Sequence, residues 1–169
     1  MEKRKRCEDI VRSVPRKLMQ QGIDLCKRNI TDFLSEAQLT ITKGNLNHAC
    51  ISVEFAIEEL GKILVLRDAM KSGVDPIFIN GKEFCSHTRK SEKAWTVLDS
   101  NHRTIFEGDF EEEDFDHRDF VTNTTASHET RLDCAFVDYY DGDWYLGRDI
   151  DKERLENLIK HIEETLKTV

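Results

Sequence analysis

Residues that interrupt helices are scarce in this sequence, because only 2 of its 169 residues are proline and 8 are glycine. Charged residues make up 34% of the chain and hydrophobic residues 38%, a balance typical of a folded protein with long solvated helices. A chain of this length forms one domain by default, since it buries enough surface to fold without staples. We therefore expect a mainly all-α protein with a single domain over residues 1–169.

Long apolar runs are also absent. The longest stretches, such as Ile63 to Leu66, fall far short of the roughly 20 residues that span a bilayer. The first residues, Met-Glu-Lys-Arg-Lys-Arg, lack the apolar core of a secretion signal. The sequence therefore predicts a cytoplasmic protein that has no membrane partner.

The 5 cysteines are odd in number and form no C-x-x-C pair. Neither a disulfide framework nor a zinc ribbon is indicated, so we expect buried thiols. The sequence also lacks H-E-x-x-H, Walker A, G-x-G-x-x-G and G-x-S-x-G motifs, which excludes the commonest zinc proteases, nucleotide-binding proteins and serine hydrolases.

Surplus positive charge is missing as well, because the net charge is −8 and carboxylates gather between Asp109 and Asp119. A protein that binds duplex over its whole surface would be basic, so any contact with nucleic acid must be local. His117 and its neighbouring aspartates have the ligand types of a divalent metal site. Such acidic runs are usually solvated loops, and we expect neither a metal nor a cofactor.

Periodic apolar residues predict four helices, over about 15–43, 45–70, 82–99 and 151–167. Gly44 is the expected cap of the first helix and Asp151 that of the last. Because the link between the first two helices is short, we expect them to be antiparallel neighbours.

Elsewhere the helical period is lost. Residues 1–13 are expected to form a basic N-terminal extension, and residues 104–127 an acidic loop poor in helix formers. Asp141 and Gly142 stand between two runs of β-branched and aromatic residues and favour a type I′ turn. The sequence therefore predicts a short β-hairpin near 133–146.

The second predicted helix is apolar on two nearly opposite faces and is therefore expected to be central. One face holds Val53, Ile57, Leu60, Ile63 and Leu64, and the other Ile51, Phe55 and Leu66. Glu58 and Lys62 lie on the second face, with Glu59 at its border, and form an i, i+4 pair. Such a pair is ordinarily a surface bridge that contributes about 0.3–0.5 kcal/mol. Because burying charge is costly, a buried Glu58–Lys62 pair instead indicates a functional site, and both interpretations stay open.

Residues 56–62, Ala-Ile-Glu-Glu-Leu-Gly-Lys, resemble the A-x-E-E-L-G-K motif of AbiV abortive-infection proteins, a branch of the HEPN-like helical bundles. His87 and Lys90 match the family's H-x-x-K, and residues 131–138 resemble its R-x-x-x-x-Y-V-D segment, with Phe136 in place of the tyrosine. The resemblance covers roughly residues 15–150. It implies a HEPN-like antiparallel helical bundle, often dimeric, that acts in phage defence by shutting down the infected cell.

These segments together predict one polar pocket, to which Glu58, Lys62, His87, Lys90 and Arg131 all contribute. In that pocket the cations would hold phosphate, and His87 would act as acid or base because the reference pKa of histidine is about 6.5. His87 falls on the core stripe of its helix, so the alternative is an ordinary hydrogen-bonded core histidine.

HEPN ribonucleases typically carry an arginine followed, after four to six residues, by a histidine. Arg154 and His161 have this spacing and fall on one helix face. Chance alone supplies such a pair in a chain of this composition, so we favour coincidence, and catalysis stays open.

The favoured function is anti-phage defence of the abortive-infection type, by a module that is triggered by a phage protein and shuts down host translation. The alternatives are a metal-independent ribonuclease that cleaves cellular RNA and a toxin–antitoxin subunit that acts by sequestration. The expected partners are a second copy of the chain, the phage protein, and RNA or the translation machinery.

Overall fold

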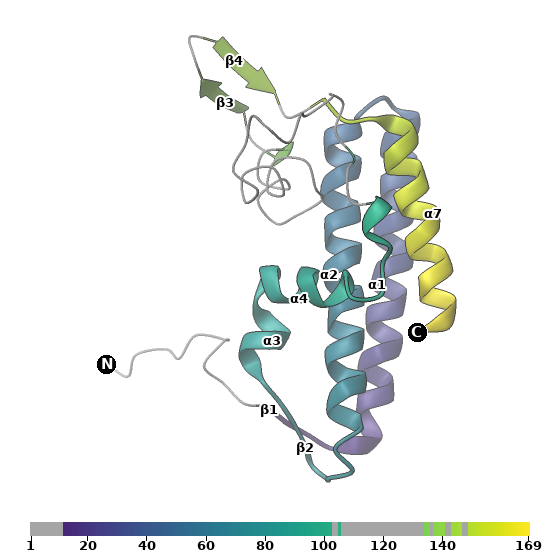
Figure 1. Ribbon diagram of the computed structural model, residues 1–169, viewed down its shortest axis with the longest axis vertical. Helices are drawn as coiled ribbons and strands as arrows, with labels where there is room; N and C mark the ends of the chain where they lie inside the picture. The colour runs from purple at the N-terminus through teal and green to yellow at the C-terminus, as the bar shows by residue number, and fades with distance from the viewer. Residues whose placement is uncertain (1–11, 103–104, 106–133, 136, 141–142, 147–148) are drawn as a thin grey trace.

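Three long helices form the body of the protein: α1 (Arg16–Thr42), α2 (Leu46–Met70) and α7 (Lys152–Thr168). The computed structural model describes residues 12–102, 105, 134–135, 137–140, 143–146 and 149–169. Figure 1 shows α1 and α2 antiparallel and side by side, with α7 packed along both. The predicted mainly helical, antiparallel bundle is confirmed.

The tight link between α1 and α2 follows from its capping residues. Gly44 adopts φ +75°, a conformation that residues with a side chain rarely adopt. Its N–H donates to the carbonyl of Ile41 at 2.9 Å. The side chain of Asn45 then accepts from the N–H of His48 at 3.1 Å and starts α2. The end of α1, the start of α2 and the helical hairpin that the two helices form are therefore as predicted.

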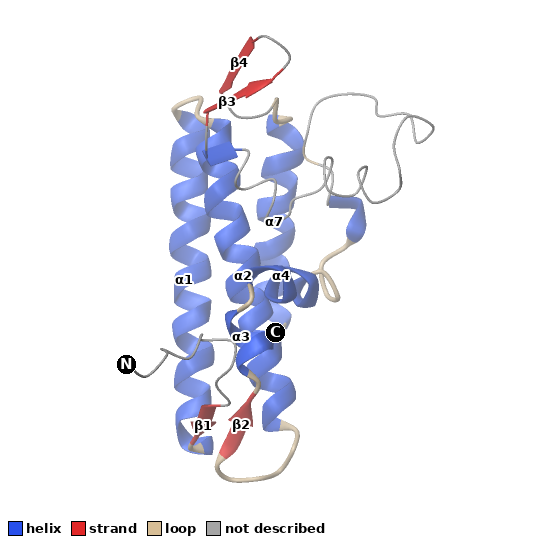
Figure 2. Cartoon of the chain, turned by 90° about the vertical axis from the view of Figure 1, so that its left-hand side faces the viewer, coloured by secondary structure: helices blue, strands red, loops and turns tan. Residues whose placement is uncertain are grey.

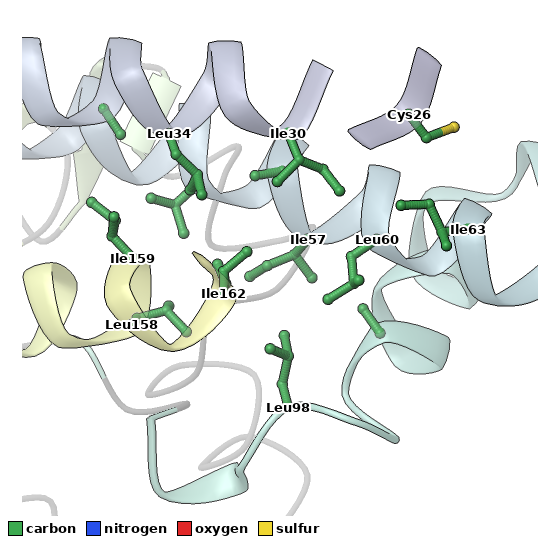
Figure 3. Packing of buried hydrophobic residues seen from close by; sticks show 14 of the residues in the cluster. Cys26, Ile30, Leu34, Ile57, Leu60, Ile63, Leu98, Leu158, Ile159 and Ile162 are labelled. Carbon is green, nitrogen blue, oxygen red and sulfur yellow. The ribbon is translucent and has the colours of Figure 1, made fainter. Parts of the chain in front are cut away.

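The hydrophobic core lies where the three long helices meet, as Figure 3 shows. α1 contributes one buried stripe, whereas α2 is buried on both sides, which confirms its predicted central place. The residues of α7 that complete this core include Leu158, Ile159 and Ile162.

The third predicted helix is wrong as a single element over 82–99. The structure has two short helices instead, α3 (Gly81–Cys85) and α4 (His87–Ala94), followed by the turn η2 (Ser100–His102). Ser86 separates them in an extended conformation, and its side chain accepts from the N–H of Arg89 as the cap of α4. Because a serine offers the backbone this alternative bond, it interrupts a helix that apolar spacing alone suggests. In Figures 1 and 2, α4 crosses the middle of α2.

Two small antiparallel sheets complete the described part of the chain. The predicted hairpin is confirmed as β3 (Val137–Tyr140) and β4 (Asp143–Leu146). The other sheet, which the sequence analysis missed, pairs β1 (Arg12–Val14) with β2 (Ile77–Ile79). This sheet joins the residues before α1 to the segment after α2. Arg12 and Ser13, which were predicted to belong to the basic N-terminal extension, are part of strand β1 instead.

Part of the predicted acidic loop is packed. Ile105 is fully buried, and its carbonyl accepts from the N–H of Asp151 at the start of α7, at 2.8 Å. The acidic run from Asp109 to Asp119 lies outside the described residues. No helix in the described ranges is long and apolar enough to cross a membrane.

The cysteines differ in part from the expectation. Cys26, Cys50 and Cys134 are buried and not disulfide-bonded, as predicted. Cys85 at the end of α3 is disulfide-bonded, so the expectation of thiols alone is wrong for this residue. Cys7 lies outside the described residues.

Candidate functional site

Helix α4 meets α2 at a residue without a side chain. Gly61 is buried, and a Cβ atom there would lie 1.9 Å from the carbonyl oxygen of Lys90. Real Cβ atoms never approach an oxygen so closely, so only glycine allows this contact between the two helices. The glycine of the E-E-L-G-K motif therefore sets how deeply α4 sits against α2.

This close approach brings two residues of α4 to one carboxylate of α2. Oε2 of Glu58 lies 2.7 Å from Nδ1 of His87 and 3.0 Å from Nζ of Lys90. His87 and Lys90 are three residues apart, so they project from the same face of the helix that Ser86 starts. The first two segments of the motif pattern thus converge on a single oxygen atom.

Burial differs sharply within this cluster. The side chains of Glu58 and Lys90 are each 5% exposed, whereas that of His87 is 49% exposed. The expectation that His87 lies in the core is therefore wrong, and Lys90 takes the buried position instead. The cluster is a buried ion pair that reaches the surface through an imidazole ring.

The electrostatics of the cluster keep Glu58 ionised. Burial by itself raises the pKa of Glu58, but hydrogen bonds from His87 and Lys90, together with the charge of Lys90, hold that pKa below its ordinary value. A buried carboxylate that accepts two hydrogen bonds, one of them from a cation, is satisfied despite its loss of water.

Lys62 does not pair with Glu58 as predicted. Its Nζ atom binds the carboxylate of Glu59, three residues earlier on α2, and lies 6.0 Å from the centre of the Phe84 ring. Lys62 was the expected partner because it is the cation of α2 that lies within about one turn of Glu58. In the folded protein α4 supplies Lys90, and Lys62 pairs with Glu59.

Cys26 of α1 extends the cluster on its other side. Burial raises the pKa of the Cys26 thiol to about 12, and the charge of Glu59 and a hydrogen bond to it act in the same direction. The thiol therefore stays protonated at neutral pH. The sequence placed Cys26 only on the core stripe of its helix, and no spacing signal pointed to its contact with Glu59.

The charges of the described cluster cancel. Glu58 and Glu59 are ionic partners of Lys90 and Lys62 respectively, so both lysines are engaged with carboxylates. Within the described residues, this cluster has no net positive charge that would support the predicted role of these cations in holding phosphate. Arg131, the remaining predicted cation of the pocket, lies outside the described residues.

Arg154 and His161, the predicted alternative catalytic pair, both lie on α7 and each contacts another residue. Arg154 binds the carboxylate of Asp151, the cap of α7, at 3.1 Å. Nε2 of His161 accepts from the backbone N–H of Asp99 at 2.8 Å, and its ring stacks on His102 with centroids 4.6 Å apart. These contacts hold the segment after α4 against α7.

A metal site finds no support among the residues that the structure describes, where no three His, Cys, Asp or Glu side chains are grouped for one. His117 and its neighbouring aspartates lie outside those residues. The chemistry that the described site offers is that of a half-exposed imidazole oriented by a buried carboxylate.

Two features together define the class of protein: a bundle of long antiparallel helices, and a short crossing helix that brings an H-x-x-K pair to a buried glutamate of the central helix. This is a HEPN-like helical fold. The model of the family described as AbiV, HEPN_AbiV, matches residues 18–167, and the chain therefore belongs to the AbiV family.

The family match includes α7, which the resemblance seen in the sequence had left out. Comparison with curated proteins and with solved structures gave no match. As a member of this family, the chain is an abortive-infection, HEPN-type defence protein.

Proposed function

We propose that the protein remains quiet until a phage protein engages it, and that it then shuts down host translation, with the cluster of Glu58, His87 and Lys90 as its working site. The observation that carries this proposal is the convergence of His87 and Lys90 on one oxygen of Glu58. His87 is half exposed, so a partner has access to this cluster.

The energetics of the ion pair support a role beyond stability. Replacing a buried ion pair with apolar residues of similar size is often neutral or stabilising. Glu58 and Lys90 are both buried within an apolar helical bundle, where hydrophobic side chains of similar size would pack equally well. Their presence is better explained by a task that needs charge at this place.

A metal-independent ribonuclease is the second candidate, and one observation favours His87 over His161 as its acid or base. His87 is hydrogen-bonded to a buried carboxylate and half exposed, whereas Nε2 of His161 accepts from the backbone of Asp99. Arg154→Ala tests the Arg154–His161 motif, because the side chain of Arg154 is exposed and its ion pair with Asp151 lies at the start of α7. Full protection by this variant is the expected result, and its loss in a folded variant would favour the motif.

The protein is also proposed to act as a homodimer. Leu18, Leu25 and Leu39 of α1 are each 44–54% exposed, and their spacing by multiples of seven places them on one helix face. Exposed leucines in a row are typical of a surface that another protein covers. A second copy is the partner that the family resemblance implies.

Phage challenge of cells that carry the gene tests the function. Incorporation of labelled amino acids and sequencing of RNA ends after infection distinguish a block of translation from RNA cleavage. The informative variant is Glu58→Gln with Lys90→Met, which removes both charges while keeping size. Lys93→Met is its matched control, because Lys93 belongs to the same helix but pairs with the exposed Asp68. A folded double variant that still protects cells would disprove the site, and arrest without new RNA ends would exclude the ribonuclease.

A further inference from the structure

We propose that Glu58 is a positioning residue that holds His87 in the tautomer with its proton on Nδ1, and that Nε2 of His87 exchanges a proton with a hydroxyl group of the molecule that this site binds. This inference rests on the proposed function of the same site, and it names the atom that acts there.

The tautomer follows from the chemistry of the two groups. An ionised carboxylate only accepts hydrogen bonds, and Oε2 of Glu58 lies 2.7 Å from Nδ1 of His87. Nδ1 must therefore carry the proton of this bond. In the neutral ring the other nitrogen, Nε2, is then the basic atom.

Neighbouring residues of α2 and α4 fix the orientation of the His87 ring. Glu58 belongs to the central helix, and its oxygen is held a second time by Lys90 at 3.0 Å. The backbone of Lys90 rests against Gly61, and Ser86 caps the helix just before His87. A base whose direction is set in this way needs little reorganisation when a proton moves.

The charge balance fits a reversible proton transfer. The carboxylate that accepts from the ring is at the same time paired with Lys90, so its charge is shared between the two partners. When the O–H bond of a bound hydroxyl breaks, its proton forms a new N–H bond at Nε2. The resulting imidazolium keeps its Nδ1–H bond to Glu58, and the proton later leaves Nε2 for water or for a leaving oxygen. The side chain of His87 is 49% exposed, which leaves the ring within reach of a molecule at the surface.

Two substitutions of His87 separate this role from a purely structural one. In His87→Asn the side-chain amide occupies the place of Nδ1 and still donates to Glu58, whereas in His87→Gln the amide reaches the place of Nε2. Neither amide accepts a proton at neutral pH. We expect both variants to fold and both to lose protection by about 100-fold or more, the scale of general acid–base contributions. Thr88→Ala, on the exposed surface of the same helix, is expected to protect like wild type.

Protection by His87→Asn would overturn the inference, because it would reduce His87 to a partner of Glu58. Protection by His87→Gln alone would overturn it too, since a hydrogen bond without proton transfer would then suffice. If these variants and the Glu58→Gln/Lys90→Met variant all protect, the proposed function of the site fails as well.

Nuclear magnetic resonance reports the tautomer directly in the intact protein. Long-range nitrogen–proton correlations of labelled histidine are expected to show Nδ1 protonated and Nε2 unprotonated in His87, with the signal assigned by its loss in His87→Asn. In the Glu58→Gln/Lys90→Met variant we expect a mixture of tautomers. A wild-type ring protonated mainly at Nε2 would refute the assignment.

Discussion

At the scale of single residues, the most informative atom is Oε2 of Glu58. It accepts from a lysine as buried as itself and from a histidine that is half exposed. A buried carboxylate without its cation would bear the full cost of its lost hydration, so Lys90 is needed for Glu58 to stay in place. Three charged or polar groups are thus interdependent, and removing one of them affects the others.

Lys90→Met is expected to lower the free energy of unfolding by about 3–5 kcal/mol, because it leaves Glu58 buried and unpaired with a cation. Adding Glu58→Gln should recover most of that loss. Lys93→Met should cost less than about 1 kcal/mol, since its pair with Asp68 is largely exposed. Urea unfolding measures all three, and equal losses from Lys90→Met and Lys93→Met would contradict the burial of the pair.

Glu58 also gives the stability a dependence on pH. Because its pKa in the folded protein is held below the ordinary value, its contribution is complete above the unfolded pKa of about 4.3 and is lost as pH falls through the folded pKa. Relative to Glu58→Gln/Lys90→Met, the wild type should therefore lose stability below about pH 4. Unfolding curves between neutral and acidic pH measure this difference. A difference that stays constant into the acid range would contradict the prediction.

At the scale of elements, the contact of α4 with α2 decides whether a site exists. α3 and α4 are short helices separated by Ser86, and α4 touches the central helix where Gly61 leaves room for the backbone of Lys90. The ion pair and the helix crossing therefore depend on each other: a shift of α4 outward would move both His87 and Lys90 away from Glu58.

Gly61→Ala is expected to destabilise the protein by about 1–3 kcal/mol, the usual cost of overpacking, because its Cβ would meet backbone that has to move. Protection against phage should fall with it. Gly22→Ala in α1 is the matched control, since its Cβ would lie 3.4 Å from a side-chain carbon of Leu66. That change should be neutral or stabilise by up to about 1 kcal/mol, because alanine favours helix. Similar effects of the two changes in thermal unfolding would show that the close approach at Gly61 is unimportant.

At the scale of the whole molecule, the faces of α2 are largely covered within one chain. α2 contacts α1, α4 and α7, and its core residues are buried. The two apolar faces predicted for this helix therefore have partners inside the protomer. The outer face of α1, with Leu18, Leu25 and Leu39, is the surface that we propose for contact with a second copy.

We expect light scattering to show a dimer at micromolar concentration, and Leu25→Glu to convert it to a monomer without loss of helix content. The reason is that the added carboxylate, one heptad from Leu18 and one from Asp32 on the same face, would bring a second negative charge into the interface without a partner. Val74→Glu is the control, because Val74 is 53% exposed after the end of α2 and lies outside that row. A wild-type protein that is only monomeric would rule out the dimer.

The sequence by itself determined the long elements of this protein. Local periodicity and turn chemistry, which act over a few residues, indicated the extents of α1, α2 and α7, the caps Gly44 and Asp151, and the pairing of β3 with β4. It also singled out Glu58, His87 and Lys90, together with Lys62 and Arg131, as candidates for the proposed site, because all of them carry charge or titrate within motifs.

Only the tertiary structure decided which of those residues bind each other. His87 and Lys90 are 29 and 32 positions from Glu58 in the chain, and their bonds exist because α4 lies against α2 at Gly61. From sequence, Lys62 is the nearer cation, and nothing local shows that a second lysine arrives from another helix to take its place. The break at Ser86 is local, but apolar spacing alone does not show that the serine side chain caps a new helix there. The pairing of β1 with β2 depends on the free energy of contacts between segments that are distant in the sequence, and local patterns do not contain it.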